Sequence, residues 1–144
     1  MGELVLNQFG ITDRKGQVKN PDKGFRYDVQ LAGDNVVPGD CVKIKNVAGA
    51  KVIVVEKITG ASDAVFGMVQ YESAKANVYK AGDMLTVAGD YSLITCEANG
   101  AIGAGAKVDP VVAGAKVATA TGDGIGIALT PAAVAGDLIL VKLG

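Results

Sequence analysis

The chain has 144 residues and a formal net charge of −1, from 14 basic and 15 acidic residues. This is the usual size of a single domain, and the balanced charge argues against binding to nucleic acid or to an acidic membrane. His is missing, which excludes Ser-His-Asp and Cys-His catalysis within the chain. Carboxylates or Lys could catalyse a reaction in principle, but no catalytic set stands out. We therefore expect no enzyme activity, no catalytic residue, no cofactor, no metal site and no small-molecule substrate.

Cys41 and Cys96 lie in apolar, strand-like stretches of the sequence. Two cysteines are too few for a disulfide framework or a Cys-only zinc site, so we expect packing residues in a reducing cytoplasm. The mean hydropathy of +0.32 is high for a small soluble protein, although no apolar run approaches the roughly 20 residues that span a bilayer. This surplus of apolar residues predicts burial against partner subunits.

Residues 1–35 differ in composition from the rest of the chain. The stretch TDRKGQVKNPDKG (12–24) is polar and basic, with Val18 as its only large apolar residue, and it cannot bury enough apolar surface to fold alone. It is either a mobile surface loop or an arm that becomes ordered on a neighbouring subunit. LVL before it and FRYDVQL (25–31) after it are strand-like anchors. We divide the chain into an N-terminal arm (1–35) and a β-domain (36–144).

Short apolar runs separated by turn signals follow in the β-domain, which is typical of many short strands. The run CVKIK alternates, with Val42 and Ile44 on one face of the strand. The run 51–58 is continuously apolar and is expected to be covered on both faces. Strands are predicted at 41–45, 51–58, 64–71, 84–88, 91–98, 107–112, 125–130 and 138–143. The fold class is all-β, a compact small β-barrel or β-sandwich with an extended N-terminal arm.

A Gly-Asp turn recurs before several strands, as PGDCVKI, AGDMLTV and AGDLILV, with AGDYSLI as a looser copy. Gly supplies the strained backbone of a tight turn, and Asp can accept a hydrogen bond from the backbone two residues on. A metal or ligand role would require these aspartates to converge. Segments 65–87 and 124–141 share the order strand, Ala-rich connector, Ala-Gly-Asp, strand. This order indicates a duplicated unit.

The closing stretch GIGIAL followed by TPAAVAGDLILVKL resembles the end of the head decoration, or capsid cement, proteins of tailed bacteriophages. PGDCVKI and VFGMVQYESAKANVYKAGDMLTV are similar to the middle portion of that family, so the resemblance covers residues 36–144. It implies a structural protein that binds the outer surface of an expanded icosahedral capsid and bridges major capsid subunits. Its partners would be the major capsid protein and itself, as a homodimer or homotrimer. It would be made in the host cytoplasm and end in the virion.

We expect the capsid contacts to come from the arm, because it combines basic side chains with aromatic anchors. The aromatic residues are equally compatible with ordinary packing where the arm meets the domain. On this hypothesis, deletion of residues 1–24 abolishes shell binding and leaves the β-domain folded. The candidate contact residues are Phe9, Arg14, Lys15, Lys19, Lys23, Phe25, Arg26 and Tyr27.

A second interpretation is a small β-clip-like ligand-binding or accessory domain of a metabolic enzyme. The stretch VYKAGDMLTV resembles the lead into a strand of sugar-binding modules of that kind. Such a module needs charged or aromatic residues that converge on a pocket, and the sequence does not bring a convincing set together.

Overall fold

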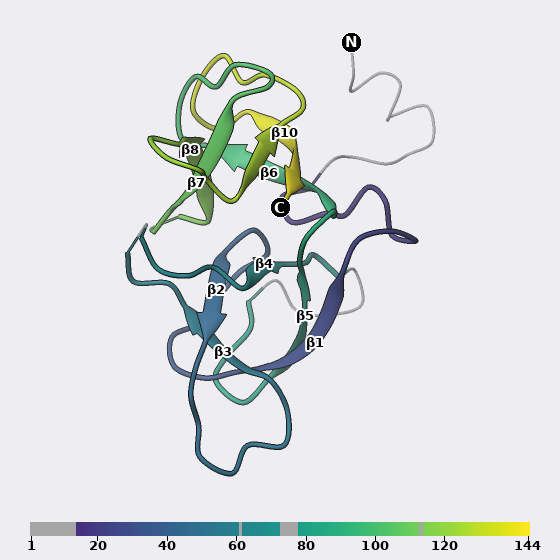
Figure 1. Ribbon diagram of the computed structural model, residues 1–144, viewed down its shortest axis with the longest axis vertical. Helices are drawn as coiled ribbons and strands as arrows, with labels where there is room; N and C mark the ends of the chain where they lie inside the picture. The colour runs from purple at the N-terminus through teal and green to yellow at the C-terminus, as the bar shows by residue number, and fades with distance from the viewer. Residues whose placement is uncertain (1–13, 61, 73–77, 113) are drawn as a thin grey trace.

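The structure of the chain, a computed structural model, describes residues 14–60, 62–72, 78–112 and 114–144. Within these ranges two closed five-stranded barrels lie one above the other along the long axis (Figure 1). The first barrel contains β1 (Arg26–Leu31), β2 (Cys41–Ile44), β3 (Val54–Lys57), β4 (Gly67–Val69) and β5 (Met84–Ala88). The second contains β6 (Leu93–Ala98), β7 (Lys107–Val111), β8 (Lys116–Thr119), β9 (Gly126–Ala128) and β10 (Leu138–Leu143). The predicted all-β class is confirmed. No membrane-spanning helix is found among the described residues.

The two barrels have the same topology. Around the first barrel the order is β1-β3-β2-β4-β5, and around the second it is β6-β8-β7-β9-β10. In each barrel the first and third strands in chain order are parallel, which are β1 with β3 and β6 with β8. Every other pair of neighbouring strands is antiparallel. Each strand of the first barrel therefore has a counterpart five strands later. The duplication that the sequence indicated for part of the chain extends over both barrels.

Three Gly-Asp turns share one geometry. Gly39, Gly82 and Gly136 have φ of 95°, 93° and 94°, a left-handed region that Gly enters without steric cost. In each turn the Asp side chain accepts a hydrogen bond from the backbone N–H three residues earlier, at 2.8, 2.8 and 3.2 Å for Asp40, Asp83 and Asp137. We expected each Asp side chain to accept a hydrogen bond from the backbone N–H two residues later. It accepts one from the N–H three residues earlier instead, and this bond closes the turn.

One hydrophobic core crosses the junction between the barrels. Met68 of the first barrel packs into the same buried cluster as Ile94 and Val141 of the second. The thiol of Cys96 lies 3.6 Å from the sulfur of Met68. Both cysteines are free and buried, and burial raises the pKa of Cys41 to about 12 and also raises that of Cys96. The thiols remain protonated and act as packing groups at the junction.

The structure shortens several of the predicted strands, and 64–71 keeps only Gly67–Val69 as β4. In the run 51–58 only Val54–Lys57 forms a strand, and Val52 and Ile53 are exposed because they belong to the loop 45–53, which protrudes from the end of the first barrel (Figure 1). The expectation that both faces of this run are covered is therefore wrong for 51–53, whereas in β3 the successive residues Val54 and Val55 are both buried. β8 was not predicted, because a short strand with Val117 as its only large apolar residue gives little signal.

The expected boundary between residues 35 and 36 does not separate an arm from a domain. β1 lies before that boundary, yet it is parallel to β3 and antiparallel to β5, and it is needed to close the first barrel. Val29 and Leu31 are buried in the core of that barrel. This strand is the strand-like anchor that the sequence indicated at 25–31, and it belongs to the barrel and not to an arm.

Candidate functional site

Residues 14–24, which we call the strap, run across both barrels. The N–H of Gly16 donates to the carbonyl of Thr95, and the N–H of Thr95 donates to the carbonyl of Gln17, both at 2.8 Å. The N–H of Tyr71, in the first barrel, donates to the carbonyl of Gly16 at 2.9 Å. The basic stretch is therefore bound to the body of the protein, because the edge of β6 offers backbone partners that its own composition cannot supply.

Several of the predicted contact residues have partners within the chain. The guanidinium of Arg14 lies 5.3 Å from the ring centre of Tyr71. The ammonium of Lys15 donates to Glu97 at 3.1 Å and to the carbonyl of Gly114 at 3.2 Å. Lys19 and Lys23 are exposed, and Phe9 lies outside the described residues. Arg14 and Lys15 thus attach the strap to the barrels, whatever their role towards a partner.

Glu97 on β6 joins the strap to β8. One carboxylate oxygen lies 3.1 Å from Lys15 and the other lies 3.2 Å from Lys116. Desolvation acts to raise the pKa of this carboxyl, but the hydrogen bonds from the two lysines outweigh it and lower the pKa. Glu97 is therefore ionised at neutral pH, and its role is structural.

The end of the strap fixes the backbone around Tyr91. The side-chain amide of Asn20 donates to the carbonyl of Tyr91 at 3.1 Å and accepts from the N–H of Leu93 at 2.7 Å. Arg26 donates to the hydroxyl of Ser92 at 2.5 Å and to the carbonyl of Asn20 at 3.3 Å. Desolvation lowers the pKa of Arg26. These bonds hold the connection between the barrels in one conformation.

Four aromatic side chains form a continuous row on the surface. Ring centres are 4.8 Å apart for Phe66 and Tyr27, 6.4 Å for Tyr27 and Phe25, and 6.1 Å for Phe25 and Tyr91. Phe25 is 52% exposed and Tyr91 is 60% exposed. The ammonium of Lys142 lies 5.9 Å from the ring centre of Tyr91. The row therefore begins half-buried at Phe66 and ends with two exposed rings.

The looser Gly-Asp copy, Gly89 and Asp90, lies beside the aromatic row and leaves space for its rings. Gly89 has no positive φ, and a Cβ there would lie 2.9 Å from the ring of Tyr27, so its missing side chain makes room for the aromatic rings. Tyr91, two residues later, has a φ of 66°, which is unusual for a bulky residue and is typically found where function or surrounding structure imposes it.

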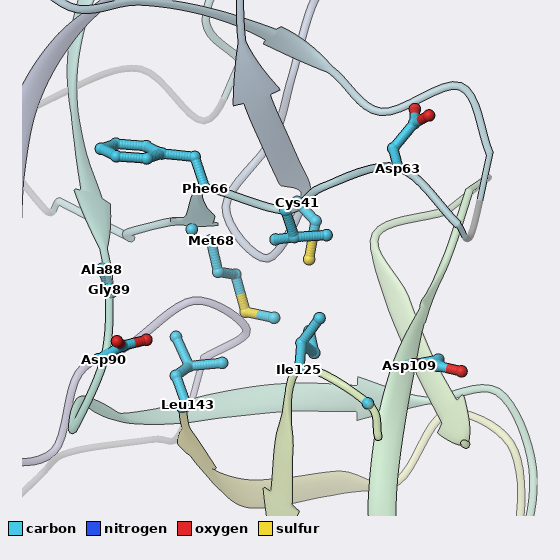
Figure 2. A pocket seen from close by; sticks show the side chains of 14 residues that line it. Cys41, Asp63, Phe66, Met68, Ala88, Gly89, Asp90, Asp109, Ile125 and Leu143 are labelled. Atoms are coloured by element: carbon cyan, nitrogen blue, oxygen red, sulfur yellow. The ribbon is translucent and has the colours of Figure 1, made fainter. Parts of the chain in front are cut away.

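A cleft of about 330 Å³ lies beside the row, between the two barrels (Figure 2). Met68, Ile125 and Leu143 point into it and make its floor apolar. Its charged lining residues are all acidic: Asp63, Asp90 and Asp109. No group of three or more residues suited to holding a metal ion occurs in the described ranges. The cleft is suited to an apolar or cationic group.

The structure brings together only part of the predicted contact set. Phe25 and Tyr27 lie in the aromatic row, whereas Arg14 and Lys15 lie along the strap, and Arg26 faces the connection between the barrels. Sequence reasoning missed Phe66 and Tyr91 as members of the row. The one local signal was the extra Tyr after the looser Gly-Asp copy, where the other copies have Cys, Met or Leu.

Comparison with known proteins is informative at the level of structure. No protein-family profile matches the chain, and no curated protein matches it by sequence. Among solved structures it is similar to the N base of the head fibre gp8.5 of bacteriophage phi29, with a TM-score of 0.55 and 14% sequence identity. The match covers 83% of this chain and 93% of the phage chain. The chain has the fold of a phage head-fibre base.

At this identity the likeness establishes the fold alone. It agrees with the β-domain that the sequence resemblance implied, and it extends the match into the region before residue 36, because 83% of the chain is more than residues 36–144 contain. The neighbour is a fibre base, so membership of the decoration family stays a prediction.

Proposed function

We propose that this protein is a structural component of a tailed-phage virion, where it binds the outer surface of the assembled icosahedral capsid and bridges major capsid subunits. The observation that supports this most is the fold that it shares with the phi29 head-fibre base over most of both chains. The sequence resemblance to head decoration proteins is an argument of a different kind that points in the same direction.

The junction between the barrels suits a bridging role. Met68 and Cys96 meet inside one core that spans both barrels, and the strap is hydrogen-bonded to both. Because the two barrels form one continuous packed unit, a contact made by each would resist relative movement of the capsid subunits beneath. A homodimer or homotrimer would repeat these contacts and add avidity.

The contacts that we propose are centred on the exposed aromatic end of the row. Phe25 belongs to the predicted set and is more than half exposed, and the exposed Lys23 lies two residues earlier. Interface energy usually concentrates in a few aromatic and Arg side chains. Lys15 and Arg26 support the surface from within, since they hold the strap and the connection in place.

Cosedimentation with expanded and unexpanded capsids lacking this protein tests the proposal. We expect saturable binding to expanded capsids alone, and about tenfold or greater loss of affinity for Phe25→Ala. Val134→Ala, at an exposed apolar residue outside the row, is the matched control and should bind like the wild type. Absence of binding by folded wild-type protein to either capsid form would refute the proposed function.

The metabolic ligand-binding domain finds no support in the comparisons. It would become the leading hypothesis only if the capsid experiment failed and the cleft took up a small molecule.

A further inference from the structure

Tyr91 combines an exposed aromatic ring with a left-handed backbone, at the third position of the turn that the N–H of Ser92 closes onto the carbonyl of Gly89. Its φ of 66° is strained for a bulky residue, and its side chain is 60% exposed. Gly would adopt this backbone without strain, and little of the ring is buried in return. An observed backbone outlier of this kind is a reason to look for a function.

The surroundings of Tyr91 indicate what its ring would contact. Phe25 lies beside it at 6.1 Å between ring centres, and Asp90 precedes it in the chain and lines the cleft. Asp90 is exposed, and its carboxylate makes no ion pair or side-chain hydrogen bond with the described residues. Figure 2 shows Asp90 on one side of the cleft, next to Leu143, with Asp109 on the opposite side.

The charged lining residues and the volume of the cleft indicate which kind of group it would bind. The charged residues that line the cleft are aspartates, and of these Asp63 is already paired with Lys43 at 3.1 Å, which leaves Asp90 and Asp109. A low-dielectric cleft lined by one sign of charge concentrates ligands of the opposite sign. At about 330 Å³ the cleft is at the lower end of the range of ligand pockets, roughly 300–1,000 Å³, which suits one long side chain better than an extended ligand.

We infer that the Phe25–Tyr91 pair and the adjoining cleft bind an arginine side chain presented by a segment of the partner protein. The aliphatic stem would lie on Met68, Ile125 and Leu143, and the guanidinium would pair with Asp90 and stack on an exposed ring. A planar guanidinium is better suited to both contacts than an ammonium. Lys142 already lies over the Tyr91 ring, so the guanidinium would displace this ammonium or stack on the exposed ring of Phe25 instead.

This inference rests on the proposed function in one respect, which is that the partner is the capsid subunit. It can be tested without capsids by titrating the ¹⁵N-labelled full chain with N-acetyl-arginine methylamide and following the amide shifts. The matched control ligand is the citrulline analogue, which has nearly the same shape and no charge. We expect saturable shifts at Gly89, Asp90 and Ile125 with the arginine compound, and at least tenfold weaker binding of the citrulline compound.

Three variants complete the experiment. Asp90→Asn should weaken arginine binding about tenfold, whereas Asp34→Asn, at an exposed aspartate outside the cleft, should leave it unchanged. Tyr91→Gly should also weaken binding while keeping or raising the unfolding midpoint, because it relieves the backbone strain. Equal binding of the two ligands, or unchanged binding by Asp90→Asn, would overturn the inference.

Capsid binding by the same variants separates the two proposals. If wild-type protein binds arginine and does not bind capsids, the capsid role fails and the arginine site stands. If Asp90→Asn and Tyr91→Gly lose arginine binding and still bind capsids like the wild type, the capsid role stands and the inference that the capsid subunit supplies the arginine fails.

Discussion

Gly67 at the start of β4 and Gly126 at the start of β9 occupy equivalent positions in the two barrels. A Cβ on Gly67 would lie 2.5 Å from the carbonyl oxygen of Ala88 in β5, and a Cβ on Gly126 would lie 2.3 Å from that of Lys142 in β10. Ala88 and Lys142 are themselves equivalent, since each pairs with the residue that follows the glycine. A short strand thus approaches the last strand of its barrel more closely than a side chain would allow, and the chain uses the same device twice.

Gly67→Ala and Gly126→Ala should each destabilise the fold, by about 1–3 kcal/mol or more, because the backbone oxygen must move to accept the methyl group. Urea unfolding followed by circular dichroism measures the effect. Gly122→Ala is the control, because a Cβ there meets nothing within 4 Å and φ is not positive. An unfolding midpoint for either core variant equal to that of the control would contradict the close approach.

Replacing the Asp by Ala should destabilise the protein at the three closed Gly-Asp turns and have little effect at the looser copy. Asp137→Ala removes hydrogen bonds from the N–H groups of Ala133 and Val134, and Asp83→Ala removes one from Lys80. Each should cost about 1–2 kcal/mol, since a carboxylate acceptor is lost. Asp90→Ala should stay within about 0.5 kcal/mol. Thermal unfolding of the three variants distinguishes them, and equal losses would mean that the looser copy forms the same turn.

Sequence reasoning succeeded where structure is local and failed where it depends on distant partners. The turns at Gly82 and Gly136 were predictable because Gly and Asp determine the backbone within four residues. The strap was not, because its anchors are remote: Lys15 and Glu97 are 82 residues apart in the chain. The aromatic row has the same origin, since Phe25 meets Tyr91 only through the antiparallel pairing of β1 with β5. The repeated strand order indicated duplication, but a pattern of small residues does not specify how strands pair.

Asp63 should give the protein a stabilising contribution that is lost in acid. Its carboxylate accepts bonds from the N–H of Thr59 at 2.8 Å and from Lys43 at 3.1 Å, and these bonds lower its pKa to about 2. Because the folded pKa lies below the unfolded value of 3.8, the contribution is complete above about pH 4 and disappears as the pH falls through about 2. Asp63→Asn keeps an acceptor and cannot titrate. Between pH 4.5 and 2, approximately, the unfolding midpoint of the wild type should therefore fall further than that of the variant. Parallel curves for the two proteins would exclude the proposed linkage.

Removal of residues 1–24 should loosen β6 in addition to any effect on capsid binding. The strap accepts hydrogen bonds from the N–H groups of Thr95 and Leu93, through the carbonyl of Gln17 and the side chain of Asn20, at 2.8 and 2.7 Å. We therefore expect faster amide hydrogen exchange at these two positions in the truncated protein, because their backbone donors lose their partners to solvent. The opposite edge of β6 pairs with β10, so Val141 should keep much of its protection and serves as the internal control. Loss of protection at Val141 as well would mean that the strap is needed for the whole second barrel. Unchanged exchange at Thr95 would restore the view of this stretch as an independent arm.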